Sequence, residues 1–240
     1  MVAPARLRVR VHGTPGITPF LSNGLRARHR LESALQACGL SLAGFERVLD
    51  FGCGCGRVLR CLESYRDTCR LYGSDIDREA IAWCAANIPF ARFYVNEPLP
   101  PLVFDTDTFD LIYAISVLTH LDEPQQFRWL EELRRVARPG GTLVVSVQGE
   151  GAWHVLSEDD RAALRDLGFV LVRTDRWKGM FPDWYQWAYH TPDYVRQHFG
   201  RYFDVLRYIP RGLTPQQDLV VLRKPWERVR VMPGTLLDSF

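Results

Sequence analysis

The residues that point most directly to chemistry lie in one short segment, VLDFGCGCGR at positions 48–57. It combines a carboxylate, Asp50, with glycines at 52, 54 and 56 directly after an apolar run. Glycine lets the backbone turn sharply and lets a ligand approach closely, and the start of a helix offers backbone N–H donors without partners. The pattern therefore predicts a ligand-binding turn between a strand and a helix, with a plain tight turn as the alternative.

The spacing of these glycines differs from that of a dinucleotide-binding turn. Such a turn follows G-x-G-x-x-G, and its third glycine helps to seat a pyrophosphate. Here that third position is Arg57, and the pattern reads D-x-G-x-G-x-G from Asp50. The segment therefore disfavours a nicotinamide-dependent oxidoreductase.

A second carboxylate follows at the end of the next apolar run. Asp75 closes LYGSD and lies 25 positions after Asp50. A carboxylate presents two acceptor oxygens in one plane, which suits the neighbouring hydroxyls of a ribose. Asp77 is better suited to cap the helix that follows. We therefore expect Asp50 and Asp75 to contact opposite ends of one ligand.

These groups must be positioned by elements that alternate between short β-rich runs and helical stretches from residue 45 to 148. Such alternation is typical of a parallel sheet covered by helices. We expect strands at 47–51, 70–74, 91–96, 109–115 and 142–147, then near 169–174 and at 219–222. We expect helices at 24–40, after the glycine loop through Val58, Leu59 and Leu62, at 77–87, 122–137 and 157–167, and from Thr191 onward.

The ordered set of motifs resembles the class I S-adenosylmethionine-dependent methyltransferases. The resemblance covers roughly residues 45–150, through the glycine loop, Asp75, FDLIYAISVLTHL (109–121) and RPGGTLVVSV (138–147). It implies an α/β, Rossmann-like fold with an open, mostly parallel seven-stranded sheet, helices on both faces and an antiparallel last strand. The cofactor is then expected at the carboxyl ends of the strands.

The resemblance also divides the chain into four parts of one domain. Residues 1–44 would form an N-terminal segment and helical cap, and residues 45–150 the cofactor-binding core. Residues 151–224 would complete the domain with an aromatic-rich substrate insertion, and residues 225–240 would form a tail.

The residues that would hold S-adenosylmethionine follow from the same resemblance. Asp50 would orient the methionine ammonium, and Asp75 the ribose. Asn96 and the residue after it stand where relatives have an acidic or amide group facing the adenine. The expected cofactor-binding set is Asp50, Gly52, Cys53, Gly54, Gly56, Asp75, Ile76, Asn96, Glu97, Ala114, Ile115 and Ser116.

Histidine is the first residue type to consider for catalysis. Methyl transfer is an in-line displacement, and a hydroxyl acceptor must also lose a proton. An imidazole, with an ordinary pKa of about 6.5, can accept that proton near neutrality. His120 is the first candidate because it follows the fourth strand, and His190 and His154 are the others. The alternative for His120 is a residue at a helix start bonded to nearby backbone.

Aromatic side chains are concentrated after the fifth strand. Trp177, Phe181, Trp184, Tyr185, Trp187 and Tyr189 lie within 13 residues. Aromatic faces stack on sugars, flat rings and cations, and in related enzymes the insertion at this point commonly builds the acceptor pocket. We expect Trp184, Tyr185 and Trp187 to contact substrate. Packing of a small subdomain on the sheet is the equal alternative.

Composition excludes several classes of protein. The 240 residues are 47% hydrophobic and 24% charged, as in soluble globular proteins, and the net charge is only +2. The 30 basic residues are dispersed, which disfavours nucleic acid as a partner. No apolar run reaches the roughly 18 residues of a membrane span, and no secretory signal is visible at the N-terminus. The six cysteines lack metal-ligand spacing, so no metal is expected.

The function expected from these observations is methylation of a small-molecule acceptor. The C-terminal stretch 203–225 (FDVLRYIPRGLTPQQDLVVLRKP) looks like that of bacterial methyltransferases acting on sugars or secondary metabolites, so a hydroxyl acceptor ranks first. A cytoplasmic enzyme, monomeric or homodimeric, fits this interpretation. The alternatives are a non-catalytic module that binds the cofactor or a partner, and a methyltransferase acting on nucleic acid or protein.

Overall fold

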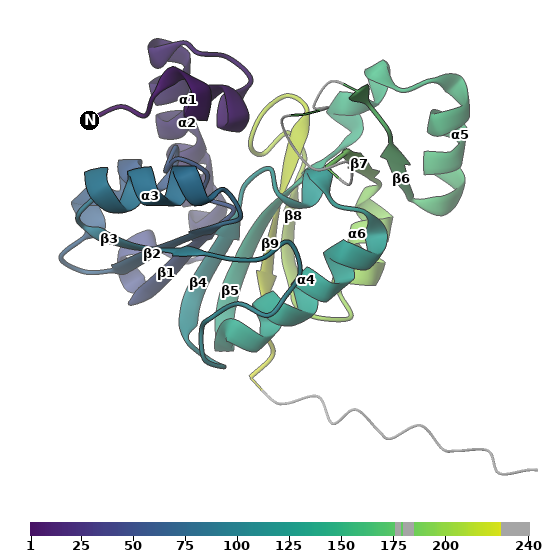
Figure 1. Ribbon diagram of the computed structural model, residues 1–240. Helices are drawn as coiled ribbons and strands as arrows, with labels where there is room; N and C mark the ends of the chain where they lie inside the picture. The colour runs from purple at the N-terminus through teal and green to yellow at the C-terminus, as the bar shows by residue number, and fades with distance from the viewer. Residues whose placement is uncertain (176–178, 180–184, 227–240) are drawn as a thin grey trace, which may run out of the picture.

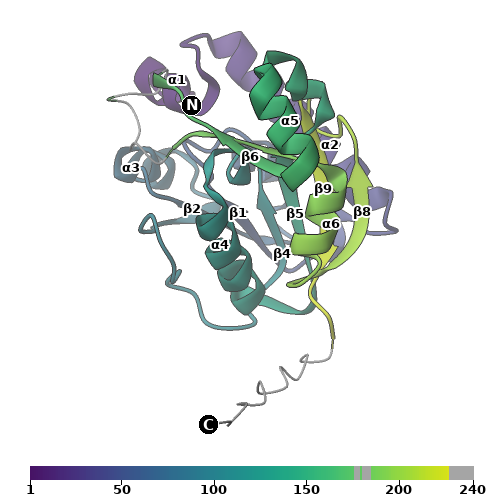
Figure 2. The same cartoon turned by 90° about the vertical axis from the view of Figure 1, so that its right-hand side faces the viewer.

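A sheet of nine strands runs through the residues that the computed structural model describes, which are 1–175, 179 and 185–226. Helices cover both faces of this sheet, as Figures 1 and 2 show. The strands are β1 (Arg47–Phe51), β2 (Arg70–Asp75), β3 (Ala91–Val95), β4 (Phe109–Ala114), β5 (Ala137–Gln148), β6 (Phe169–Val172), β7 (Trp187–His190), β8 (Asp204–Ile209) and β9 (Gln217–Arg223).

Seven of these strands lie in the order β3-β2-β1-β4-β5-β9-β8. Strands β1 to β5 pair in parallel, β9 is antiparallel to β5, and β8 is antiparallel to β9. The expected open, mostly parallel α/β sheet with an antiparallel last strand is thus confirmed. The chain order reverses between β1 and β4, which is where open α/β sheets form a crevice at the carboxyl ends of their strands.

The expected number of seven strands is too small, because β7 and β8 were not predicted. β6 and β7 form an antiparallel hairpin that joins the main sheet through one register pair, Gln148 on β5 and Tyr189 on β7. The segment of β7, WAYH, is buried on both faces from Ala188 to His190, so it lacks the apolar–polar alternation by which a half-buried strand is recognised. The hairpin is an insertion beside the end of β5.

The helices begin and end close to their predicted positions where a capping side chain fixes them. Asp77 accepts from the backbone N–H groups of Glu79 and Ala80, and Asp122 accepts from that of Gln125. The α-helices are α1 (Ala5–His12), α2 (Ile17–Gln36), α3 (Arg78–Asn87), α4 (Glu123–Val136), α5 (Glu158–Leu167) and α6 (Pro192–Phe199), and the 3-10 helices are η1 (Leu42–Gly44), η2 (Leu59–Tyr65), η3 (Leu118–His120) and η4 (Glu150–Val155).

Two predicted helices and one predicted strand differ in bounds or type, and α1 was not predicted. α2 begins at Ile17 and ends at Gln36, not at 24 and 40. The helix predicted after the glycine loop is the 3-10 helix η2. Within it, the Cys61 N–H donates to the carbonyl of Val58, three residues earlier. β5 begins at Ala137 because that residue pairs with β4 across a bulge, ahead of the Pro-Gly-Gly turn.

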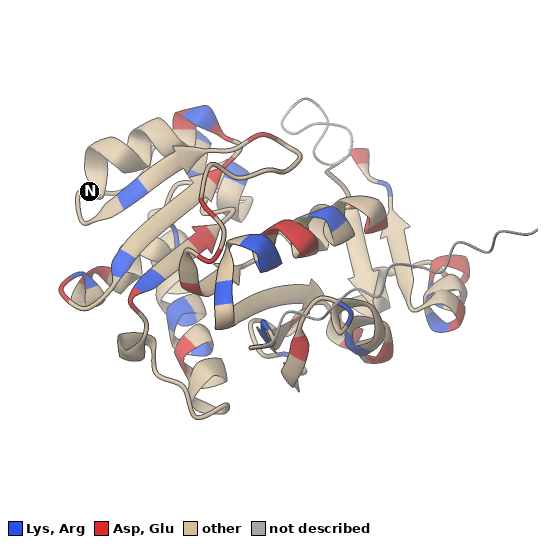
Figure 3. Cartoon of the chain, turned by 90° about the horizontal axis from the view of Figure 1, so that it is seen from below, with Lys and Arg blue, Asp and Glu red and all other residues tan. Residues whose placement is uncertain are grey.

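The core lies in two layers, one on each face of the sheet. On one face, Leu130 and Leu133 of α4 pack with Phe199 of α6, and on the other, Leu31 and Leu35 of α2 pack against the sheet. Figure 3 shows acidic and basic residues interspersed over the elements seen from below. None of the described helices has the length and apolar character needed to cross a bilayer.

Candidate functional site

The glycine loop is bent into a form that other residues would not adopt. Gly52 and Gly54 have φ angles of 75° and 53°, in the left-handed region that glycine occupies without strain. A Cβ at Gly54 would lie 2.4 Å from Cγ2 of Val11 on α1, and one at Gly52 would lie 2.3 Å from Val117 after β4. The loop is therefore packed between the N-terminal cap and the end of β4.

A cavity of about 430 Å³ lies at the carboxyl ends of the parallel strands. The glycine loop and the residues after β2 and β4 form one wall. The end of α1 and one face of α2 form another, and the residues before β7 and the turn before β9 complete it. The cavity thus occupies the crevice that the strand order predicts, and it is covered by segments from both ends of the chain.

Asp50 provides a buried acceptor in this cavity. Its side chain is at the end of β1 and the residue is only 3% exposed. Burial raises the pKa of Asp50 to about 7, although the neighbouring Tyr113 hydroxyl and Arg57 guanidinium oppose that change. Its Oδ2 has no hydrogen-bond partner among the described residues. Because an unpaired buried carboxylate oxygen is costly, Asp50 is suited to a cationic donor from a ligand.

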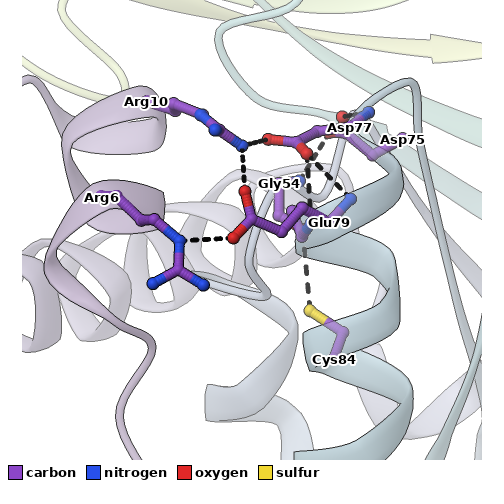
Figure 4. A network of polar contacts seen from close by, with 8 residues as sticks. Arg6, Arg10, Gly54, Asp75, Asp77, Glu79 and Cys84 are labelled. Atoms are coloured by element: carbon purple, nitrogen blue, oxygen red, sulfur yellow. Dashed lines mark hydrogen bonds and ion pairs between the residues drawn. The ribbon is translucent and has the colours of Figure 1, made fainter.

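Asp75 is fixed by the loop that it faces, as Figure 4 shows. Its Oδ2 accepts from Gly54 N–H at 2.7 Å, and its Oδ1 accepts from Asp77 N–H at 2.8 Å. Burial raises the pKa of this carboxyl, and the backbone bonds oppose the rise. Each oxygen retains a further lone pair. Asp75 therefore orders the loop and still presents acceptors to the cavity.

His120, on η3, also lines the cavity. Its ring stacks on Tyr185 at a centroid distance of 4.0 Å, and its Nδ1 is 2.9 Å from the carbonyl oxygen of Gln186. A carbonyl only accepts, so Nδ1 carries the hydrogen and Nε2 keeps the lone pair. No described residue bonds Nε2. Burial lowers the pKa of His120 to about 4, so the ring is neutral at physiological pH.

The other two histidine candidates do not line the cavity. His190 is fully buried on β7, and its Nε2 is 2.9 Å from Oε1 of Gln126. Burial lowers the pKa of His190 to about 3. His154 is exposed on η4 with Nδ1 3.0 Å from the Gly151 carbonyl. Neither ring is within reach of a ligand in the cavity, so only His120 of the three remains as the candidate base.

Most of the predicted cofactor-binding residues meet at the cavity, but three do not. Gly56 faces Ile88 and Cys84 of the α3 region, Ala114 is fully buried in β4, and Glu97 is exposed and pairs with Arg78 at 3.0 Å. Trp184 lies outside the described residues. The predicted residues that line the cavity are Asp50, Gly52, Cys53, Gly54, Asp75, Ile76, Asn96, Ile115, Ser116, His120, Tyr185 and Trp187.

Asn96 lines the cavity with both ends of its amide already engaged. Its Oδ1 accepts from the Ser74 hydroxyl at 2.6 Å, and its Nδ2 donates to the Glu97 carbonyl at 2.8 Å. Its second lone pair and second N–H are the groups that remain for a ligand.

The expected N-terminal cap contributes to the cavity through residues that the sequence analysis did not name. Asn23, Arg26 and Ala27 of α2 line it at i, i+3 and i+4 spacing, which places them on one helix face. Arg57 was used only to exclude a dinucleotide, yet it lines the cavity close enough to Asp50 for their charges to interact. Its Nε is buried without a hydrogen-bond partner among the described residues.

Ion pairs connect α1 to the start of α3 beside the cavity (Figure 4). Arg10 lies 2.8 Å from Asp77 and 2.9 Å from Glu79, and Arg6 also pairs with Glu79. Half-exposed pairs of this kind contribute little individually, about 0–1 kcal/mol. The contact of Leu7 with the buried cluster around Phe20 therefore provides much of the attachment.

The cysteines offer no metal site and no reactive thiolate at the loop. No group of three or more His, Cys, Asp or Glu side chains among the described residues is placed to hold a metal ion. All six cysteines are free, and burial raises the pKa of Cys53 and, to about 12, that of Cys55. Both thiols are therefore protonated at neutral pH.

The central part of the chain, residues 49–145, matches the family model described as a methyltransferase domain. The malonyl-[acyl-carrier protein] O-methyltransferase of Hahella chejuensis is 28% identical over 115 residues, which cover 45% of this chain and 40% of that protein. An uncharacterised methyltransferase of Synechocystis is 24% identical over 160 residues, covering 58% of this chain and 74% of that protein. The chain spans 40% and 38% of the first two curated relatives that it matches.

Solved structures of methyltransferases share the fold over most of the chain. The S-adenosylmethionine-dependent methyltransferase of Mesorhizobium loti has a TM-score of 0.61 at 19% identity, covering 80% of this chain and 96% of that one. Human N-acetylserotonin methyltransferase, in complex with S-adenosylmethionine, has a TM-score of 0.61 at 16% identity, covering 92% and 56%.

The sheet order and the cavity at the strand ends define a class I S-adenosylmethionine-dependent methyltransferase fold. Residues 49–145 match the methyltransferase domain model, and S-adenosylmethionine is the cofactor present in solved structures that share the fold.

Proposed function

We propose that the chain transfers a methyl group from S-adenosylmethionine to a hydroxyl of a small-molecule acceptor, such as a sugar or a secondary metabolite. The observation that carries the proposal is the composition of the cavity. It brings together a buried carboxylate oxygen of Asp50 and a ring nitrogen of His120, neither of which is hydrogen-bonded by a described residue. The first suits the ammonium of the cofactor, and the second suits a hydroxyl.

The wall formed by β1 and β2 fits the cofactor. Asp50 would accept from the methionine ammonium, Asp75 would accept from the ribose hydroxyls, and Ile76 would supply an apolar surface beside the adenine. The Asp50 carboxyl would become fully ionised beside that ammonium, because an opposite charge lowers its pKa. When bound, S-adenosylmethionine supplies a methyl group on a positively charged sulfur.

The opposite wall fits a neutral acceptor better than a cationic amine. The carboxylates among the described lining residues belong to β1, to β2 or to the turn after β2: they are Asp50, Asp75 and Asp77. The lining residues that come after β4, before β7 and before β9 carry no carboxylate; besides His120 they include aromatic, apolar and neutral polar groups, namely Tyr185, Trp187, Leu213, Ser116, Thr214 and Gln217. A positively charged amine would lack a counter-charge at this end, whereas a hydroxyl requires only an acceptor.

His120 would orient the hydroxyl and take its proton as the new bond forms. The bond from Nδ1–H to Gln186 fixes the tautomer, so Nε2 is the accepting atom. With a pKa of about 4, His120 is a weak base but is always unprotonated at pH 7. General bases typically contribute 10²–10⁴-fold to rate, and the alignment of the acceptor with the sulfonium contributes the rest.

The acceptor class rests on this lining and not on the relatives. Curated relatives act, by their names, on malonyl-[acyl-carrier protein], a sterol and tRNA. Dispersed basic residues favour a small molecule over nucleic acid here, because phosphate contacts need clustered cations. A binding module without turnover is the competing function.

The test combines cofactor binding with a panel of acceptors. We expect the chain to bind S-adenosylhomocysteine by calorimetry and to label hydroxylated acceptors from methyl-labelled S-adenosylmethionine. His120→Ala should lower turnover at least 10-fold and leave cofactor affinity unchanged, whereas Glu97→Gln, an exposed control outside the cavity, should change neither. Binding without any labelled product would favour the module, and product only with amines would overturn the hydroxyl assignment.

A further inference from the structure

The β6–β7 hairpin contacts η3 through the residues at the start of β7, next to the cavity. Just before β7, Gln186 N–H donates to the His120 carbonyl at 3.1 Å, while the Gln186 carbonyl accepts from the His120 ring at 2.9 Å. Trp187, the first residue of β7, lies against the same ring at a centroid distance of 4.8 Å. His120 is therefore bound to the hairpin through both its backbone carbonyl and its ring.

A second connection reaches η3 from behind, through a buried glutamine of α4. Gln126 is 1% exposed, and its Nε2 donates to the carbonyls of Leu118 and Leu121, each at 2.9 Å. These two carbonyls lie on either side of His120 in the chain. One amide group thus fixes both ends of the turn that carries the proposed base.

The orientation of that amide is set by His190 at the far end of β7. Because Nε2 of Gln126 serves two carbonyls, its Oε1 must accept, so the His190 Nε2 at 2.9 Å carries the hydrogen. His190 is fully buried among Phe169, Tyr194 and Phe199. Its Nδ1 has no hydrogen-bond partner among the described residues. The His190 ring therefore contributes one hydrogen bond to this network, from its Nε2–H to Oε1 of Gln126.

We propose that His190 and Gln126 are positioning residues that hold residues 118–121 so that Nε2 of His120 faces the acceptor. His190 acts on Gln126, Gln126 acts on η3, and neither side chain touches a ligand. The hairpin thereby contributes to the site at both ends of β7. This inference rests on the proposed function only in giving His120 an acceptor to contact, since the network itself exists without one.

Leucine substitutions remove the polar groups while keeping an apolar side chain. Gln126→Leu leaves the carbonyls of Leu118 and Leu121 without their donor, and His190→Leu leaves the buried Oε1 of Gln126 without its donor. His190→Gln is the conservative variant, because its Nε2 can reach nearly the position of the imidazole Nε2. Val136→Ala, at the buried C-terminal end of the same helix α4, is the control for general loosening of the core.

The first measurement is the side-chain ¹⁵N spectrum of His120 in the S-adenosylhomocysteine complex. We expect one fixed Nδ1–H tautomer in the wild type, in His190→Gln and in Val136→Ala. We expect exchange between tautomers or a shifted signal in Gln126→Leu and His190→Leu. If Gln126 and His190 only stabilised the core, Val136→Ala would change the His120 spectrum as much as the leucine variants do. The same His120 spectrum in Val136→Ala and in the leucine variants, at the same loss of melting temperature, would overturn the proposal.

The second measurement separates positioning from binding of the cofactor. With the hydroxylated acceptor of highest turnover, we expect kcat to fall at least 10-fold in the two leucine variants and to return within about 3-fold of wild type in His190→Gln. The S-adenosylhomocysteine Kd should stay within about 2-fold in all of them. Unchanged kcat and an unchanged His120 spectrum in both leucine variants would refute the network's role. Should Gln126→Leu fail to fold, His190→Leu carries both tests.

The two proposals fail in distinguishable ways. If wild-type protein shows no methyl transfer to any acceptor, the proposed function fails, while the spectrum of His120 still reports whether the network positions the ring. If transfer occurs and the spectrum is unaffected by the leucine variants, only the positioning proposal fails.

Discussion

The Asp75 carboxylate accepts a 2.7 Å hydrogen bond from the backbone N–H of Gly54, across 21 residues of chain. One residue expected to bind the cofactor therefore also shapes the loop that is expected to cradle it. The bond joins the end of β2 to the turn after β1, two elements that are adjacent because their strands pair in parallel. Loop order and ligand affinity should consequently depend on the same side chain.

Replacing Asp75 should affect both properties. Asp75→Ala removes the acceptors of Gly54 and Asp77 and those offered to the ribose. Cofactor affinity should fall by about 1–3 kcal/mol, because charge-assisted hydrogen bonds are lost. Calorimetry with S-adenosylhomocysteine measures the affinity, and thermal unfolding of the ligand-free chain should show a lower melting temperature. A drop in affinity with no change in melting temperature would contradict the role of Asp75 in ordering the loop.

Asp50 should make the ligand-free protein less stable as the pH rises. Its pKa is about 7 in the folded state against an ordinary value of about 4, so the folded chain binds more protons between these values. The contribution of this group to the free energy of unfolding therefore declines from pH 4 to pH 7. Asp50→Asn should be less sensitive to pH over this window in urea titrations. If the free energy of unfolding changed with pH in the same way in the wild type and in Asp50→Asn, the unfavourable burial of the Asp50 carboxylate would be refuted.

The close approach of α1 to the glycine loop can be tested at Gly54. Gly54→Ala places a Cβ 2.4 Å from Val11 at a φ of 53°, so both the contact and the backbone are strained. We expect a loss of about 1–3 kcal/mol in the free energy of unfolding. Val11→Ala in the same chain should recover part of this loss by relieving the contact, but not the part that comes from φ. Full additivity of the two substitutions would show that α1 does not rest on the loop.

The two buried histidines should make stability fall in acid. Their folded pKa values, about 4 for His120 and about 3 for His190, lie below the ordinary value of about 6.5. The unfolded chain thus binds more protons in this window, and the stabilisation is complete above pH 6.5 and lost as the pH falls toward 3. His190→Gln should reduce this loss in unfolding titrations at pH 4.5 and 7. An identical loss in wild type and variant would indicate that His190 is not buried in its neutral form.

The sequence was most informative where local chemistry determines structure. β1 was predicted with its bounds, and Asp77 was recognised as a helix cap because a cap depends on neighbours within three residues. The glycine loop and Asp75 followed from fixed spacing and from the rule that parallel strands end at one edge.

The features that were missed depend on partners far away in the chain. Whether residues 187–190 form a strand depends on β6 and β5, and the link from His190 to Gln126 spans 64 residues. An imidazole that binds ligand and one that holds a buried amide have the same sequence signature. Part of α2 was predicted as a helix at 24–40, but only the fold shows that Asn23, Arg26 and Ala27 line the cavity.

The most direct test of the central claim is calorimetric titration of S-adenosylhomocysteine into the wild type and Asp50→Asn. Removal of a buried charge that faces an ammonium should cost about 1.5–3 kcal/mol, which is roughly 10- to 100-fold in Kd. We predict single-site binding to the wild type and that loss of affinity in the variant, with Glu97→Gln unchanged. No binding to the wild type, or equal affinity in Asp50→Asn, would contradict the account of this cavity as the cofactor site.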